Sequence, residues 1–174
     1  MFWGRFGLSL TLLSLCSFGA GAHHSDHLCM RRSFWKELIH GLEKTNPILS
    51  PKCRTEYEKR LQLPTIVKPA KQDRTPAAIE ILKGIQKLFS EPNIPLPKKE
   101  RQVFLNSVSE ILSQLQSCVK STHSDYIYQA DIQERFKKLR DFIKQKENSR
   151  CAWEIVHAVT REILQTSAIH HTTK

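Results

Sequence analysis

Apolar residues recur along most of the chain at the spacing of an amphipathic α-helix, three or four residues apart. The first such stripe consists of Met30, Phe34, Leu38 and Leu42. Four more follow, and no alternating strand pattern of useful length is found. The pattern therefore predicts five helices: the first ends between residues 41 and 46, the second begins at 75–76, the third spans about 99–119, the fourth lies between 125 and 150, and the fifth begins at 151. Thr75 is expected to cap the second helix, with Pro76 as its first residue.

A long connection rich in proline joins the first helix to the second, from about residue 46 to 74. A loop of this length is uncommon between antiparallel neighbours. It is expected if the first two main helices run parallel, as in long-chain cytokine bundles. The predicted fold is therefore an all-α, five-helix bundle. Its four main helices have up-up-down-down topology, and the fourth helix in sequence lies within the second crossover.

The N-terminus has the features of a secretory signal peptide. Arg5 precedes an apolar run over 6–18, and Ala20-Gly21-Ala22 supplies small residues for cleavage. As a membrane anchor the run is too short, because a span needs about 20 apolar residues. We expect residues 1–22 to be removed and residues 23–174 to form one secreted domain without a membrane span.

Four cysteines remain after the predicted cleavage, at positions 29, 53, 118 and 151. An even number in a secreted chain predicts two disulfides. Zinc is the alternative, but none of the four forms the close pairs that zinc sites favour. In the predicted topology Cys29 and Cys118 lie at one end of the bundle, and Cys53 and Cys151 lie at the other. The expected bridges are therefore Cys29 to Cys118 and Cys53 to Cys151.

The last helix, CAWEIVHAVTREIL from residue 151, has two faces on a helical projection. The apolar face, which is expected to be buried, consists of Ala152, Trp153, Ile155, Val156, Val159, Ile163 and Leu164. The outward, polar face consists of Glu154, His157, Ala158, Arg161, Glu162 and Gln165. Nothing on the outward face looks catalytic, so this face is interpreted as a surface for binding a partner.

This helix resembles the Cys-Ala-Trp-Glu-Val-Val-Arg signature in the last helix of type I interferons. Residues 73–90 and 104–119 are similar to the second and third helices of that family, and the four cysteines match its four-cysteine members in order and approximate spacing. The resemblance implies a helical cytokine with the same disulfide pairing and with neither enzymatic activity nor a cofactor. Two departures are His157, where many members have arginine, and the lack of an N-glycosylation sequon.

The function that the resemblance implies is that of a secreted, monomeric type I interferon. Such a cytokine binds the two chains of the interferon-alpha/beta receptor and triggers JAK-STAT signalling and antiviral innate defence. In the family, the last helix and the start of the long first loop contact the high-affinity chain. Carried over, the receptor-binding residues are Arg54, Tyr57, His157, Ala158, Arg161 and Glu162. An exposed His157 facing an acidic receptor group would strengthen binding as the pH falls.

Two alternatives remain open. ILSQLQSCV at 111–119 also resembles type III, lambda-like interferons, and another helical cytokine would share the fold. From a different class, the net charge of +10 is compatible with a basic heparin-binding or membrane-active secreted protein. Glycosaminoglycans are therefore expected as weak partners. Specific nucleic-acid binding is not expected, because no nucleic-acid motif is present. Histidines near the two ends, at 23, 24, 27, 170 and 171, are interpreted as solvated rather than as metal ligands.

Overall fold

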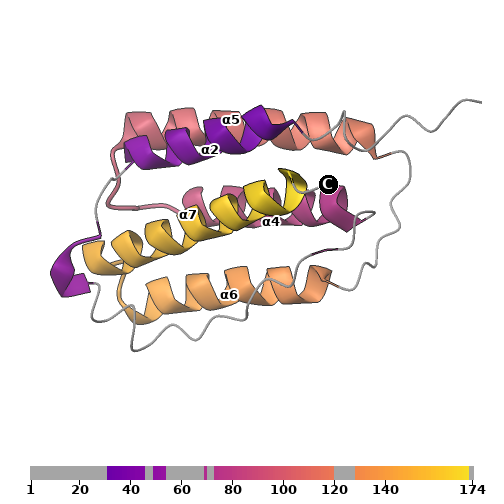
Figure 1. Ribbon diagram of the computed structural model, residues 1–174. Helices are drawn as coiled ribbons and strands as arrows, with labels where there is room; N and C mark the ends of the chain where they lie inside the picture. The colour runs from indigo at the N-terminus through magenta and orange to yellow at the C-terminus, as the bar shows by residue number, and fades with distance from the viewer. Residues whose placement is uncertain (1–30, 46–48, 54–68, 70–72, 120–127, 173–174) are drawn as a thin grey trace, which may run out of the picture.

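The computed structural model describes residues 31–45, 49–53, 69, 73–119 and 128–172 (Figure 1). Five long helices make up most of this part of the chain: α2 (Arg32–Thr45), α4 (Arg74–Phe89), α5 (Lys98–Cys118), α6 (Gln129–Gln145) and α7 (Arg150–Thr172). Residues 51–53 form one further helical turn, and the described residues contain no strand. The prediction of an all-α fold with five long helices is confirmed.

Contacts between helix ends establish the direction of the four main helices. The C-terminal turn of α2 meets the N-terminal half of α7, where a ring nitrogen of His157 lies 2.8 Å from the carbonyl oxygen of Leu42. At the C-terminus of α4, the Phe89 ring lies 5.3 Å from Phe104 near the start of α5 and 5.8 Å from Trp153 near the start of α7. Therefore α2 and α4 run in one direction and α5 and α7 in the other, as predicted.

Helix α6 lies in the second crossover and runs parallel to α4. Near the start of both helices, the Gln133 side-chain amide donates a hydrogen bond to Glu80 at 3.2 Å. Helix α2 packs against α5 and α7, while α4 packs against α5 and α6. In Figure 1, α7 passes in front of α4 and between α2 and α6. Helix α7 therefore contacts three other helices.

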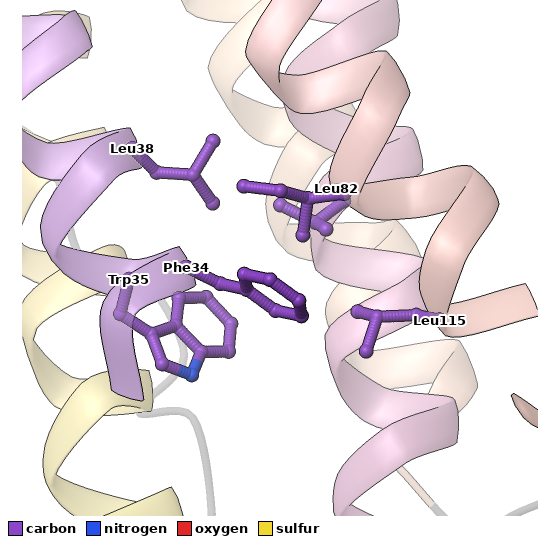
Figure 2. Close-up of a pocket in the computed structure, with 6 residues that line it drawn as sticks. Phe34, Trp35, Leu38, Leu82 and Leu115 are labelled. Atoms are coloured by element: carbon purple, nitrogen blue, oxygen red, sulfur yellow. The ribbon is translucent and has the colours of Figure 1, made fainter. Parts of the chain in front are cut away.

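The core is continuous and includes the apolar stripes seen in the sequence. All seven residues of the predicted buried face of the last helix are at most 1% exposed. Figure 2 shows Phe34, Trp35 and Leu38 of α2 facing Leu82 of α4 and Leu115 of α5. The hollow between these side chains leaves no volume that a water molecule could occupy. This hollow is part of the packed core and not a ligand site.

The start of α4 differs from the prediction. The helix begins at Arg74, with Asp73 in the N-cap position, so Thr75 lies inside the helix and is 6% exposed. Pro76 is the third helical residue. The first four backbone N–H groups of a helix have no intrahelical acceptor, so a proline loses nothing anywhere in this turn. A proline in the first turn therefore does not determine which residue begins the helix.

A close approach between α4 and α6 requires glycine at position 84. A Cβ atom there would lie 2.3 to 2.5 Å from three ring carbons of Phe136, which is 2% exposed. We expect Gly84→Ala to lower the free energy of unfolding by about 1–3 kcal/mol, because overpacking outweighs the better helix propensity of alanine. Gly41→Ala is the matched control, because its Cβ would lie 3.3 Å from a Phe104 ring carbon. Urea denaturation measures both, and equal stability of the two variants would contradict this packing.

Candidate functional site

The N-terminus of α7 is fixed to the segment that follows α2. The hydroxyl of Ser149 accepts a hydrogen bond from the backbone N–H of Ala152 at 3.3 Å and caps the helix. One residue into the helix, Cys151 forms a disulfide with Cys53, with the two Cα atoms 5.5 Å apart. The predicted bridge between Cys53 and Cys151 is confirmed. It covalently joins the first long loop to the start of the last helix.

The other predicted bridge is only partly within the described residues. Cys118, at the C-terminus of α5, is half-buried and disulfide-bonded. Its expected partner, Cys29, lies outside the described residues. The pairing of Cys29 with Cys118 therefore stays a prediction.

Glu154 forms a second link to the same loop. Its carboxylate accepts a hydrogen bond from the backbone N–H of Ser50 at 3.0 Å and another from the Arg150 side chain at 3.2 Å. The residue is 7% exposed. Burial by itself would raise the pKa of Glu154, but the hydrogen bonds from Ser50 and Arg150 outweigh it and hold the pKa below its usual value. Glu154 is therefore an ionised anchor for the loop.

His157 forms a third link, to the end of α2. Because the Leu42 carbonyl oxygen can only accept, Nε2 of His157 carries the proton and donates to it at 2.8 Å. The Thr45 hydroxyl donates to the same oxygen at 2.8 Å. Leu42 belongs to the last turn of α2, where carbonyl groups lack intrahelical donors. His157 and Thr45 together cap this helix end.

The expectation that His157 lies on an exposed outer face is wrong. The residue is 6% exposed, and Glu154, assigned to the same face, is also buried. The end of α2 and residues 50–53 cover the first two turns of α7 on the side that a helical projection leaves open. Because His157 is buried, the structure does not support its expected role in pH-dependent receptor binding. The predicted disulfide between Cys53 and Cys151 could have indicated this burial, because it brings backbone polar groups of the loop to this side of the helix.

The buried imidazole predicts a pH dependence of stability. Burial lowers the pKa of His157 below 6.5; the bond to Leu42 and the charge of Glu43 oppose this shift, and the charge of Arg161 adds to it. The unfolded chain therefore binds this proton at higher pH than the folded chain does. The free energy of unfolding should be constant above about pH 6.5 and fall below it, by at most about 1.4 kcal/mol per pH unit.

Urea titrations between pH 7.5 and 5.5 measure this dependence. His157→Gln keeps a donor near Leu42 and removes the titrating group, so its stability should depend less on pH in this range. His40→Gln, which replaces an exposed histidine of α2, is the control and should leave the dependence unchanged. A wild-type pH dependence in His157→Gln would show that the group responsible lies elsewhere.

Beyond its first two turns, α7 presents an open strip that we call the outer α7 face. Its members share one side of the helix and are Ala158, Arg161, Glu162, Gln165 and Ile169. Ala158 is half-buried, the other four are exposed, and Ile169 reaches 61% exposure. Arg161 forms an ion pair with Glu43 of α2 at 2.7 Å. Of the predicted receptor residues, the structure thus brings together Ala158, Arg161 and Glu162, whereas Arg54 and Tyr57 lie outside the described residues.

On the other side of the bundle, α4 and α5 enclose a cleft of about 270 Å³. Its lining is polar apart from two residues and consists of Gln86, Phe89, Ser90, Arg101, Gln102, Leu105, Asn106 and Ser109. Arg101 donates one hydrogen bond, to the carbonyl oxygen of Glu91 at 3.3 Å. The lining has no acidic side chain, so the cleft suits a ligand group with negative charge or hydrogen-bond acceptors.

The described residues contain neither a metal-binding cluster nor a helix that could span a membrane. Within this part of the chain, no group of three or more histidine, cysteine or acidic residues is arranged to hold a metal ion. No described helix combines the length and the apolar character needed to cross a bilayer. The N-terminal segment 1–22 lies outside the described residues, and so do the side chains of the histidines at both chain ends.

The parallel first pair of helices, the long crossover and the bridged loop together define a helical cytokine bundle. The family model for the interferon alpha/beta domain matches residues 29–171. The chain therefore belongs to the interferon alpha/beta family, whose members are secreted signalling proteins and not enzymes. The prediction of a type I interferon is confirmed.

Two solved structures share the fold at low sequence identity. Zebrafish interferon 2 matches with a TM-score of 0.66 at 21% identity, covering 81% of this chain and 97% of that one. Zebrafish interferon 1 matches with a TM-score of 0.62 at 20% identity, covering 85% and 98%. No match was found among curated protein sequences. At these identities the structures support the fold, and membership of the family rests on the family model.

Proposed function

We propose that the chain is secreted after removal of residues 1–22 and acts as a monomeric type I interferon. It binds the two chains of the interferon-alpha/beta receptor at the cell surface and triggers JAK-STAT signalling and antiviral defence. The observation that carries the proposal is the family match over residues 29–171. A cytokine of this kind needs no catalytic group, since its activity is to hold two receptor chains together.

The high-affinity receptor chain binds the outer α7 face together with the loop that follows α2. The links at Cys151, Glu154 and His157 support this composite surface, because they hold residues 50–53 against the first turns of α7. Arg54 and Tyr57 follow Cys53 directly in sequence. Arg161 is held by Glu43 at the edge of the face, which limits the side-chain entropy that it loses on binding.

The second receptor chain binds the side of the bundle formed by α4, α5 and α6. The polar cleft between α4 and α5 supports this assignment, because it offers the guanidinium of Arg101 on a concave surface away from α7. Binding energy at interfaces concentrates in a few aromatic and arginine residues. Tyr57, Arg161 and Arg101 are therefore the residues whose truncation should matter most.

Surface plasmon resonance with the two receptor ectodomains tests the proposal. Tyr57→Ala and Arg161→Ala should each weaken binding of the high-affinity chain by about 1–3 kcal/mol and leave the second chain unaffected. Arg101→Ala should do the reverse, so each variant is the control for the other face. Circular dichroism confirms that the variants fold. Unchanged affinity in both Tyr57→Ala and Arg161→Ala would remove the outer α7 face as the receptor site.

A further inference from the structure

Helix α2 displays a line of basic side chains on its solvent side. We call it the α2 basic stripe, and it consists of Arg31, Arg32, Lys36, His40 and Lys44, all exposed. From residue 32 onward its members are four residues apart, which places them on one side of the helix at a rise of about 6 Å per step. The stripe thus extends about 18 Å along the helix.

These charges have little acidic compensation nearby. Glu37 is the only fully exposed acidic residue of α2, and Glu43 is paired with Arg161. Among the described residues, no member of the stripe forms an ion pair. Helix α6 shows the contrasting arrangement: it exposes three acidic and three basic side chains, and Lys137 pairs with Glu134 at 4.0 Å. Among the exposed side chains, positive charge is therefore in excess along α2 and balanced along α6.

Arg31 and Arg32 lie at positions where a positive charge does not stabilise α2. Arg31 and Arg32 are at the N-terminus of α2, and the first turn contains no acidic residue. A helix N-terminus carries a partial positive charge, so cations there are unfavourable and a bound anion is favourable. Positions that break a local rule of stability are often functional. The arginines are thus better explained by an anionic partner than by the stability of α2.

We propose that the α2 basic stripe binds a linear sulfated polysaccharide of the cell surface. Arginine and lysine side chains one or two helical turns apart on one side of α2 complement a chain with regularly repeated anionic groups. A lipid surface fits less well, because the described large hydrophobic side chains that are exposed are Val103 of α5 and Ile169 of α7, with none on α2. A nucleic acid fits less well, because α2 exposes no phenylalanine, tyrosine or tryptophan side chain for base stacking.

This site goes beyond the proposed receptor function and can be tested separately from it. Heparin serves as the probe in a binding assay between 0.05 and 0.3 M salt, roughly the range over which surface charges become screened. The test variant is Arg32→Gln/Lys36→Gln/Lys44→Gln. The matched control is Lys137→Gln/Lys138→Gln/Lys144→Gln on α6, which removes the same charge. All six side chains are exposed, so both variants should keep the wild-type thermal unfolding midpoint.

The α2 variant should bind heparin about tenfold more weakly than the wild type at physiological salt, with a shallower salt dependence, because fewer counterions are released. The α6 variant should bind within about twofold of the wild type, since its lysines are compensated by neighbouring acids. Receptor affinity should not change in the α2 variant, and the α6 variant should keep its affinity for the high-affinity receptor chain. Desulfated heparin should bind the wild type weakly.

Three results would overturn the proposal. Equal losses in the two variants would mean that only net charge matters. Equally tight binding to phosphatidylserine vesicles, lost in the α2 variant, would assign the stripe to a membrane. Absence of heparin binding by the wild type at physiological salt would exclude the site. None of these results bears on receptor binding, so the receptor proposal would stand.

Discussion

Replacing Cys53 and Cys151 together by serine is expected to lower the free energy of unfolding by about 2–5 kcal/mol. The two cysteines are 98 residues apart in sequence, so the bridge removes much of the chain entropy of the unfolded state. It also keeps Ser50 within hydrogen-bonding distance of Glu154. Because a domain of this size has about 5–15 kcal/mol of stability, the variant should be close to unfolding.

Guanidinium denaturation of the double variant measures the loss, and Glu154→Gln serves as a comparison. The glutamine keeps the shape of the side chain and an acceptor for Ser50, so this variant should lose less stability than the double cysteine variant. In both variants the high-affinity receptor chain should dissociate faster, because the loop after α2 is less firmly held. An unchanged unfolding midpoint in the double cysteine variant would contradict the structural role of the bridge.

Truncation of Trp153 should have an effect at least as large. Its side chain is 0% exposed and packs edge-to-face with Phe89 at 5.8 Å, at the end of the bundle where α4, α5 and α7 meet. Trp153→Ala removes this volume and should cost about 3–5 kcal/mol. Trp153→Phe should cost far less, because the indole Nε1 is buried without an acceptor among the described residues and its loss removes an unsatisfied donor.

Urea denaturation of the alanine and phenylalanine variants separates packing from hydrogen bonding at this position. Trp153→Phe should also retain wild-type receptor affinity, because the side chain does not reach the surface. Similar stability losses in the two variants would indicate a polar role for the indole that the structure does not show. Reduced receptor affinity in a fully folded Trp153→Phe would place the residue at an interface instead of in the core.

These two predictions give a physical meaning to the Cys-Ala-Trp-Glu motif at the start of α7. Cys151 binds the loop covalently, and Glu154 binds its backbone at Ser50. Ala152 is 1% exposed and Trp153 fills the core. In this chain all four residues therefore hold the bundle and its first loop together, and none belongs to the outer α7 face. The motif that carries the resemblance is thus a structural signature that supports the binding surface indirectly.

The fold could be predicted well from the sequence, because the spacing of apolar residues and the length of the first connection both indicate it. Helical periodicity located five helices, and the length of the first connection indicated their directions. The start of α4 was misplaced because prolines are tolerated throughout a first helical turn. The two-residue error concerns only the start of the helix and leaves the topology intact.

The candidate site was predicted less completely, for a different reason. A helical projection assumes that polar residues face solvent, and this holds for Arg161 and Glu162. It fails for Glu154 and His157, whose partners are backbone groups of Ser50 and Leu42. Backbone donors and acceptors at helix ends leave no signal in residue types, so a buried polar contact with them is not apparent from one helix alone. The cleft beside Arg101 was missed as well, since its lining combines ordinary polar residues of two helices.

The most direct measurement is the induction of antiviral genes in cells of a matched host treated with the secreted protein, with and without an antibody that blocks the type I interferon receptor. Strong induction at low protein concentration, abolished by the antibody and weakened by Arg161→Ala, is the predicted result. Heparin-binding variants of α2 should retain full activity at saturating concentration. Absence of induction, or induction that persists when the receptor is blocked, would contradict the assignment as a receptor-dependent type I interferon.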